Sequence, residues 1–374
     1  MGYNVSNINK INLIYSMIEV LNQLKKIASL QCNNSIHFRN GLFNAERIWA
    51  KRRYVRNDNT AFFSACIAFT LIRYKKYFTS TELQVANNII SQMQPAFDAF
   101  RNKDGHASYN FWETKPTKHF PGGYFAKRFK FFMIPDDIDD SAIIHIVKPH
   151  TRLEQLSLKE KMSAYAIGNL KWPDRPVEGY ETLKPYNTFF VKNMPSAFDI
   201  CALCNALYFS LHYNLPLNEQ DEHSLKLIHQ CLENDDHLKR PCSLSPYYPN
   251  TVLIIYHMVR LACDFKILQQ YVQKLITQCY AFLNNATLAE MERLMLVICI
   301  EKLEESCIEI SEPNDTNKAR HPFFVAGLLG EVSPKWLRKI SNYSFTQIKY
   351  TCSGYAEVLW LEHLLLFRKH QKTI

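Results

Sequence analysis

Apolar residues spaced three and four positions apart recur along most of the chain, and this periodicity constrains the fold more than any other feature. Between residues 11 and 30 the spacing is carried by Leu13, Ile14, Met17, Ile18, Leu21 and Leu24. It is the period of one apolar face of an α-helix. Runs of the same kind cover residues 60–78, 80–100, 137–147, 195–213, 222–232, 247–263, 265–282, 287–304 and 350–370. We therefore expect about a dozen helices, arranged largely as antiparallel hairpins.

The turn chemistry favours helices over strands. The 374 residues include 10 glycines, and the dipeptides typical of β-hairpins are nearly absent. No linker, compositional shift or local repeat divides the chain. We predict an all-α fold with one domain over residues 1–374, an α/α barrel (toroid) of antiparallel helical hairpins. The apolar helices around Leu203 and Ile254 would form its inner layer, and a helix within residues 1–35 would lie at its periphery.

The composition is that of an ordinary soluble globular protein. Hydrophobic residues make up 47% of the chain and charged residues 21%. No run approaches the roughly 18 apolar residues of a membrane span, and Glu19 interrupts the apolar stretch near the N-terminus, so no signal peptide is expected. The 11 cysteines are scattered and odd in number, which suggests buried thiols in a reducing compartment. We expect a cytoplasmic protein.

The formal net charge of +9 favours anionic partners such as phosphate esters, nucleic acid or a membrane surface. The basic residues are dispersed, however, and no nucleic-acid-binding motif accompanies them. Nucleic acid is therefore not expected as a partner.

Four aspartates crowd the start of one predicted helix. Residues 134–142 read IPDDIDDSA, and the acidic residues are Asp136, Asp137, Asp139 and Asp140. One or two of them would serve as helix caps without any further function. Because like charges on a shared helix face destabilise by about 0.2–0.5 kcal/mol per pair, at least one carboxyl group is expected to hold a proton or share a cation. This favours either a neutral carboxylic acid that donates a proton or a carboxylate cage for a divalent metal.

A long segment without helical periodicity leads into the aspartates. Residues 101–135 combine turn-forming glycines and prolines with aromatic residues, among them Tyr109, Phe111 and Trp112. A loop of this length inside a compact domain is usually functional or disordered, and its aromatic content argues against disorder. Its Lys127 and Arg128 are candidates for binding a substrate diphosphate. Two histidines that follow the aspartates are expected at the surface; they are His145 and His150.

Residues 137–142, with the sequence DIDDSA, resemble the DxDD(T)A motif of class II terpene cyclases, the group that includes copalyl diphosphate synthases and squalene-hopene cyclase. Those enzymes use α/α barrels. The resemblance implies that Asp139 is the acid that protonates a terminal alkene or epoxide of a polyprenyl chain, with Asp137 and Asp140 orienting and polarising it. Because an alkene is a very weak base, the donor must be a neutral carboxylic acid.

The chain departs from the family's pattern in several ways. Ser141 replaces the usual threonine, no copy of the family's QW repeat is evident, and the chain is too short for two barrel domains. The implied form is a single-barrel relative, or one whose second domain comes from a partner chain. Its activity would be protonation-initiated cyclisation of an isoprenoid diphosphate or related polyprenyl chain, with no required cofactor. Tyr109, Phe111 and Trp112 would stabilise the carbocation, and a lipophilic substrate would favour peripheral membrane contact.

Other interpretations stay open. Residues 136–140 also match DDxxD, the magnesium-diphosphate motif of class I prenyl synthases, with Asp136 and Asp140 as ligands of Mg²⁺, although the partner motif, roughly NDxxSxxxE, is not found. Alternatively, the chain is a non-enzymatic helical binding module whose acidic cluster recognises a basic partner. Such a module would tolerate Asp139→Asn, whereas an acid catalyst would not. A glycoside-processing barrel fits poorly, because its two carboxyl groups act from opposite sides of a sugar.

Overall fold

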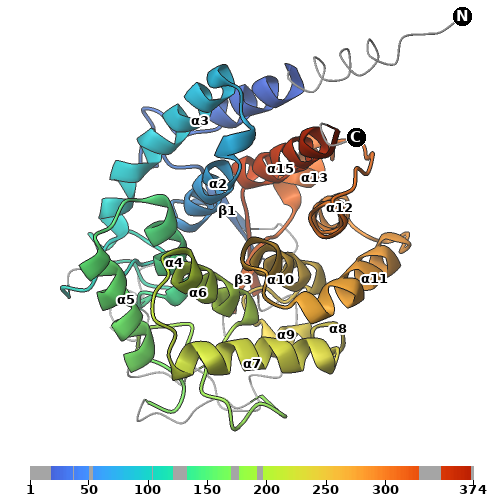
Figure 1. Ribbon diagram of the computed structural model, residues 1–374. Helices are drawn as coiled ribbons and strands as arrows, with labels where there is room; N and C mark the ends of the chain where they lie inside the picture. The colour runs from blue at the N-terminus through green and yellow to red at the C-terminus, as the bar shows by residue number, and fades with distance from the viewer. Residues whose placement is uncertain are drawn as a thin grey trace, which may run out of the picture.

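The computed structural model describes residues 18–36, 38–49, 54–102, 104–120, 133–169, 177–191, 197–327 and 347–371. Helices dominate these residues, and a small β-sheet accompanies them (Figure 1). The longer helices are residues 18–29, α2 (Phe62–Arg73), α3 (Ser80–Met93), α4 (Ile138–Val147), α5 (Arg152–Ala164), α6 (Ile200–His212), α7 (Glu219–Glu233), α10 (Thr251–Phe265), α11 (Val272–Leu283), α12 (Glu290–Glu304) and α15 (Ser353–Gln371). The shorter ones are η1 (Lys75–Tyr77), η2 (Gln94–Phe100), α8 (Asp236–Lys239), α9 (Pro241–Leu244), η5 (Gln269–Tyr271) and α13 (Asp315–Arg320). Within the described ranges, no helix is both long and apolar enough to cross a bilayer.

Six of the long helices pack in a closed ring. α2 packs against α4, α4 against α6, α6 against α10, α10 against α12, α12 against α15, and α15 returns to α2. In Figure 1 these ring helices surround a common centre, and α3, α5, α7 and α11 lie outside them. The two helices expected in an inner layer from their apolar composition, α6 and α10, are both members of the ring.

All six ring helices begin at the same end of the ring, as the contacts between their first turns show. These contacts pair Phe62 (α2) with Tyr248 (before α10), Asp139 (α4) with Tyr248, Asp199 (before α6) with Tyr247, Asn250 (before α10) with Glu292 (α12), and Phe63 (α2) with Tyr355 (α15). We call this the near end of the ring. At the opposite, far end, Arg73 closes α2 and pairs with Asp264 near the end of α10.

Burial separates the ring helices from the outer ones. Every residue of α4 is buried, and so are all but the last two residues of α6. In α3, by contrast, 5 of the 14 residues are buried, along one face. A helix that is apolar on nearly all sides is stable only in an interior, whereas an amphipathic helix covers a surface. Capping boxes begin the outer helices α3, α5 and α7, using Thr79 with Glu82, Thr151 with Glu154, and Asn218 with Asp221.

The predominance of helices agrees with the predicted all-α fold, but a four-stranded antiparallel sheet, in the order β2-β1-β4-β3, was not predicted. Its strands are β1 (Ala45–Trp49), β2 (Tyr54–Asp58), β3 (Phe324–Gly327) and β4 (Gln347–Thr351). The sequence between β1 and β2 lacks the glycine dipeptides that mark a hairpin. The central pairing sets Glu46 opposite Thr351 and so joins distant parts of the chain, which no local pattern reveals.

The sheet lies at the near end of the ring. β2 leads into α2, and β4 leads into α15. The ring of Phe324 in β3 packs edge-on against that of Phe62 in α2, with 5.4 Å between their centroids. The near end is therefore covered by strands, and the start of α4 lies beside them.

Candidate functional site

The aspartate run lies where a non-helical segment turns into α4. The helix begins at Ile138, and Asp137 is its N-cap, with a carboxylate oxygen that accepts a hydrogen bond from the backbone N–H of Asp140 at 2.7 Å. Asp136 precedes the cap. Only Asp139 and Asp140 therefore occupy the first turn, so the four carboxyl groups do not share one helix face. Their mutual repulsion persists, because after burial the charges of the neighbouring aspartates help to raise the pKa of Asp140.

All four aspartates are buried, with exposed fractions from 2% for Asp140 to 7% for Asp139. Burial disfavours the charged form of a carboxyl group, so each must find donors or hold a proton. Their partners differ. The four residues divide into an anchored carboxylate, a pair that shares a proton, and a single carboxyl group that faces other ring helices.

Asp136 is the anchored carboxylate. It accepts a hydrogen bond from Ser108 Oγ at 2.5 Å and forms an ion pair with Lys161 Nζ at 3.5 Å. The side-chain amides of Asn102 and Asn110 also donate to it. These contacts tie the segment before α4 to α5 and to the loop after η2.

Asp137 and Asp140 form the pair. A side-chain hydrogen bond joins their carboxyl groups, and adjacent buried carboxylates cannot readily both ionise. Burial is the main cause that raises the pKa of Asp137 to about 8 and the pKa of Asp140 well above its ordinary value. Among the described residues, Asp140 Oδ1 has no hydrogen-bond partner. Asp140 is thus the protonated donor of the pair, and Asp137 is the acceptor.

Asp139 is the single carboxyl group. Its Oδ1 accepts a hydrogen bond from Asn205 Nδ2 in α6, and its Oδ2 accepts one from the Tyr248 hydroxyl before α10. Burial raises the pKa of Asp139, while these two hydrogen bonds and the charge of Arg260 oppose the rise. The oxygen of Asn205 in turn accepts a hydrogen bond from Arg260 Nη2. Arg260, Asn205 and Asp139 therefore form a chain across three ring helices.

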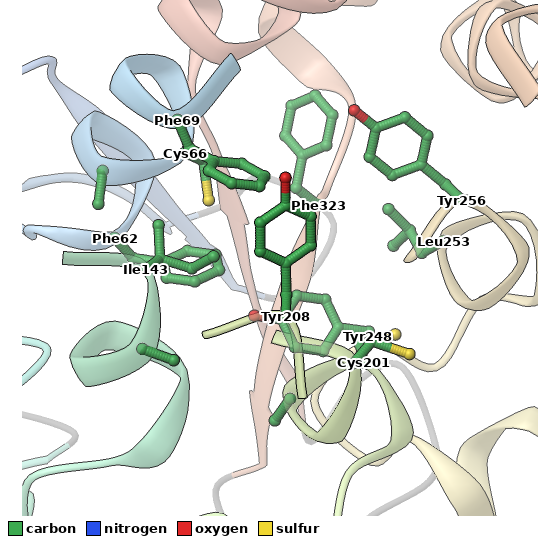
Figure 2. Packing of buried hydrophobic residues seen from close by; sticks show 14 of the residues in the cluster. Phe62, Cys66, Phe69, Ile143, Cys201, Tyr208, Tyr248, Leu253, Tyr256 and Phe323 are labelled. Carbon is green, nitrogen blue, oxygen red and sulfur yellow. The ribbon is translucent and has the colours of Figure 1, made fainter. Parts of the chain in front are cut away.

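Aromatic rings surround this carboxyl group. The ring of Tyr248 lies 6.2 Å from Phe62 and 6.2 Å from Phe324, centroid to centroid. Figure 2 shows Phe62, Cys66 and Phe69 of α2 facing the same central space as Tyr248 and Tyr256. The centre of the ring next to Asp139 is therefore largely apolar and aromatic.

Two of the predicted substrate-binding residues have other partners. Tyr109 is fully buried, and its hydroxyl hydrogen-bonds to His150 Nε2 at 2.8 Å. Trp112 donates its Nε1–H to Asp58 Oδ2 at 3.0 Å, beneath the sheet. The ring of Trp112 supports the near end, whereas that of Tyr109 lies beside the last turn of α4, against His145 and His150. No ring contact joins either of them to Tyr248 within the described ranges.

Phe111 lies closer to the site. Its ring centroid is 5.6 Å from that of Phe324, which contacts Tyr248. Lys127 and Arg128, predicted to bind a diphosphate, lie outside the described residues.

The prediction that His145 lies at the surface is wrong. It is fully buried, and its Nε2 hydrogen-bonds to the backbone oxygen of Ala107. Its ring stacks on His150 with 3.7 Å between centroids and 10° between planes. Burial, followed by the neighbouring His150, lowers the pKa of His145 to about 3. The apolar positions on every side of α4 were the available signal for this burial.

Asn205, Tyr248 and Arg260 are site residues that sequence reasoning missed, and Asp199 is a buried neighbour outside the hydrogen-bond chain that they form with Asp139. They come from α6, α10 and the segments before them, so no local motif contains them. Asp199 caps α6 through the backbone N–H of Cys201 at 2.9 Å, and it is fully buried. Burial raises its pKa to about 7. An aspartate directly before an all-apolar helix was the one sequence signal for it.

A second, partly buried polar cluster closes the far end. Arg73 forms a two-pronged ion pair with Asp264 at 2.7 and 2.8 Å, and Lys302 Nζ lies 2.5 Å from Glu362. Three tyrosine hydroxyls donate to these carboxylates; they belong to Tyr74, Tyr208 and Tyr256. The cluster joins five of the six ring helices and was not predicted.

The carboxylates do not converge on one point. Asp136 faces Lys161, Asp140 faces Asp137, and Asp139 faces Asn205 and Tyr248. Among the described residues, no group of three or more His, Cys, Asp and Glu side chains is arranged as metal ligands.

Comparisons with known proteins leave this geometry as the basis for assigning a function. No protein-family model matches the chain, and neither a curated protein nor a solved structure matches it.

Proposed function

We propose that this chain is a single-barrel relative of the class II terpene cyclases, in which Asp139 protonates an isoprenoid diphosphate or related polyprenyl chain and so initiates cyclisation. One observation carries the proposal: this carboxyl group is buried at the near end of the ring, bonded to Asn205 and Tyr248 among aromatic rings. Burial raises its pKa, which favours the neutral form that an acid catalyst needs. A cytoplasmic location with peripheral membrane contact belongs to the same proposal.

The arrangement of helices supports an α/α toroid as the fold. Six helices close a ring, and α3, α5, α7 and α11 pack outside it. The chain alternates between the two layers from α2 to α7, as helical hairpins in a toroid do. A toroid offers an enclosed, water-poor centre in which a carbocation survives.

In the proposed reaction the Asp139 carboxyl gives its proton to one carbon of a terminal alkene. The π electrons form the new C–H bond, and the other carbon becomes a cation that internal alkenes attack in turn. The final cation loses a proton, so the product is an isomer of the substrate. Asn205 and Tyr248 would both donate hydrogen bonds to the carboxylate that remains. The faces of Phe62 and Phe324 would stabilise the cation.

The magnesium interpretation finds less support. Asp136 and Asp140, its proposed ligands, have different partners: Asp136 accepts from Ser108 and pairs with Lys161, whereas Asp140 donates to Asp137. Both would have to leave these partners and turn to a common ion.

The binding-module interpretation requires an accessible acidic surface. None of the four aspartates exposes more than 7% of its surface. A basic partner would therefore contact none of them without opening the near end of the ring.

Product analysis tests the proposal. Purified protein is incubated with farnesyl, geranylgeranyl and longer diphosphates, with and without Mg²⁺, and products are identified by mass spectrometry after phosphatase work-up. We expect a cyclic isomer that retains its diphosphate until the phosphatase is added. Loss of diphosphate that depends on Mg²⁺ would instead support the metal interpretation.

Two isosteric variants sharpen the test. Asp139→Asn removes the proton donor and is expected to abolish cyclisation. Asp199→Asn changes a neighbouring buried carboxyl group; its remaining oxygen keeps the cap of α6 while the hydrogen bond from the Tyr247 N–H is lost, and it should remain active. Equal product from Asp139→Asn and the wild type would refute the role given to Asp139.

A further inference from the structure

Buried cations in the described part of the chain are paired with carboxylates, with one exception. The paired ones are Arg47 with Asp58, Lys159 with Asp221, Lys161 with Asp104 and Asp136, Lys318 with Glu357, and Arg368 with Glu82. Arg260 is 3% exposed, and no carboxylate lies within ion-pair distance of it among the described residues. It projects from α10 into the ring.

The contacts of Arg260 are neutral. Its Nη2 donates a hydrogen bond to the side-chain oxygen of Asn205, and its guanidinium carbon lies 4.9 Å from the centre of the Phe69 ring. Its Nε is buried without an acceptor. An uncompensated buried cation is strongly destabilising, so a negative charge is needed near Arg260 that its direct contacts do not supply.

The carboxyl group nearest in the hydrogen-bond chain is that of Asp139. It reaches Arg260 only through Asn205, whose amide donates to Asp139 and whose oxygen accepts from Arg260. In this arrangement the charge of Arg260 opposes the rise in the pKa of Asp139 that burial causes, and so favours loss of its proton. An acid catalyst, however, needs that proton in place.

We propose that Arg260 binds an anionic group of the ligand, a phosphate-type oxyanion, and that this anion replaces Asp139 as the charge that balances the guanidinium. The planar fork of an arginine suits two oxygens of such a group. Once the anion is bound, its negative charge beside Asp139 favours protonation of that carboxyl group. Ligand binding thus protonates Asp139, the acid of the proposed reaction. The anion site stands independently, whereas its use in catalysis rests on the function proposed above.

Other titratable groups near the two residues bear on this coupling. The titratable groups that interact electrostatically with Asp139 are Cys66, Asp137, Asp140, Asp199, Cys201, Cys204, Tyr248 and Arg260. Those that face Arg260 include Cys66, Arg73, Tyr256, His257 and Tyr355. Burial raises the pKa values of these cysteines and tyrosines, so they stay neutral near pH 7. Asp199, whose pKa is raised to about 7, is the neighbour that most needs a control.

Titration calorimetry with inorganic pyrophosphate tests the site on the full chain. Binding heats measured at pH 7 in two buffers of different ionisation enthalpy give the number of protons taken up. Subtracting the value for Asp139→Asn cancels the protons that pyrophosphate itself gains or loses. We expect saturable binding, and an uptake up to about one proton larger in the wild type than in Asp139→Asn. Asp199→Asn should keep the wild-type uptake.

Asn205→Asp supplies the decisive variant, because it keeps the shape of the side chain and places a carboxyl group directly against Arg260. This internal anion should compete with pyrophosphate and weaken its binding at least about tenfold. Arg260→Gln should weaken binding similarly, and thermal unfolding of both variants verifies that they fold. Acetate, which also offers two oxygens, should bind more weakly than pyrophosphate.

Three results would overturn the proposal: no saturable binding, equal binding by the wild type and Asn205→Asp, or the same proton uptake with and without Asp139. These outcomes are separate from the fate of the cyclase proposal. Cyclisation without pyrophosphate binding would refute the anion site alone. Pyrophosphate binding that Asn205→Asp abolishes would support the site even if no isoprenoid reacts.

Discussion

The variant Asp140→Asn tests whether this carboxyl group is neutral in the folded protein. Asp140 is 2% exposed, hydrogen-bonds to Asp137, and has a pKa raised well above its ordinary value by burial. Asparagine has the same shape and donates to Asp137 as the protonated acid does. Below about pH 3.8, where the aspartate is neutral in both the folded and the unfolded chain, the variant should therefore be nearly as stable as the wild type.

The two proteins should diverge as the pH rises. Between pH 5 and 7 an unfolded aspartate is ionised, whereas the folded Asp140 keeps its proton. The folded wild type thus holds one more proton than the unfolded chain, and its stability falls with rising pH by about 1.4 kcal/mol per unit for that proton. Asp140→Asn loses this contribution. Over two pH units the variant should gain about 3 kcal/mol relative to the wild type.

Urea denaturation at pH 5, 6 and 7 measures the difference. The control is Asp315→Asn: the side chain of Asp315 is 83% exposed and its pKa is lowered, so it is ionised in both states across this range. Its stability curve should run parallel to that of the wild type. A parallel curve for Asp140→Asn as well would mean that Asp140 is ionised, and the account of the shared proton would fail.

Three further changes probe the surroundings. Tyr248→Phe removes a hydrogen-bond donor to Asp139, so it should cost about 1–3 kcal/mol of stability and raise the pKa of the Asp139 carboxyl group. The infrared C=O stretch of Asp139, measured against pH, reports that pKa. An unchanged band would contradict the hydrogen bond. Glu362→Gln removes the negative charge that Arg73 and Lys302 share, so it should lower the free energy of unfolding by about 3 kcal/mol or more in urea denaturation. A loss below about 1 kcal/mol would show that Glu362 does not stabilise these two cations. Burial lowers the pKa of His145 to about 3, so below pH 6.5 the unfolded chain binds one more proton than the folded chain, and stability falls as the pH falls. His145→Gln should remove about 1.4 kcal/mol per pH unit of this fall between pH 6 and 4. Equal slopes of stability against pH in the variant and the wild type would argue against a neutral His145.

The helices were predictable because their signal is local. The apolar spacing of three and four placed the ends of α6, α7, α10 and α12 within five residues of the observed ones. The sheet was missed because its central pairing, β1 with β4, depends on residues from opposite parts of the chain. A five-residue strand next to a long apolar helix, such as β4 before α15, has too few residues for its own periodicity to stand out.

Of the candidate site, only the aspartate run at the start of α4 could be predicted from the sequence. Four clustered aspartates stand out in any sequence, and Asp137 proved to be a helix cap as well. The partners of Asp139 lie 66 and 109 positions away, at Asn205 and Tyr248, and neither has a motif around it. Which aspartate meets which donor is decided by the packing of α4 against α6 and α10, and periodicity does not specify that packing.

The balance of charge distinguishes the two ends of the ring and bears on the choice of substrate. At the far end Arg73 and Lys302 face Asp264 and Glu362, so positive and negative charges match. Towards the near end Arg260 depends on Asp139, which as a proton donor must be neutral. A substrate with its own negative charge satisfies both requirements, whereas a neutral polyprene satisfies only one. We therefore expect cyclisation of isoprenoid diphosphates but little of neutral polyprenes of the same chain length; equal turnover of both would show that Arg260 and Asp139 are not coupled.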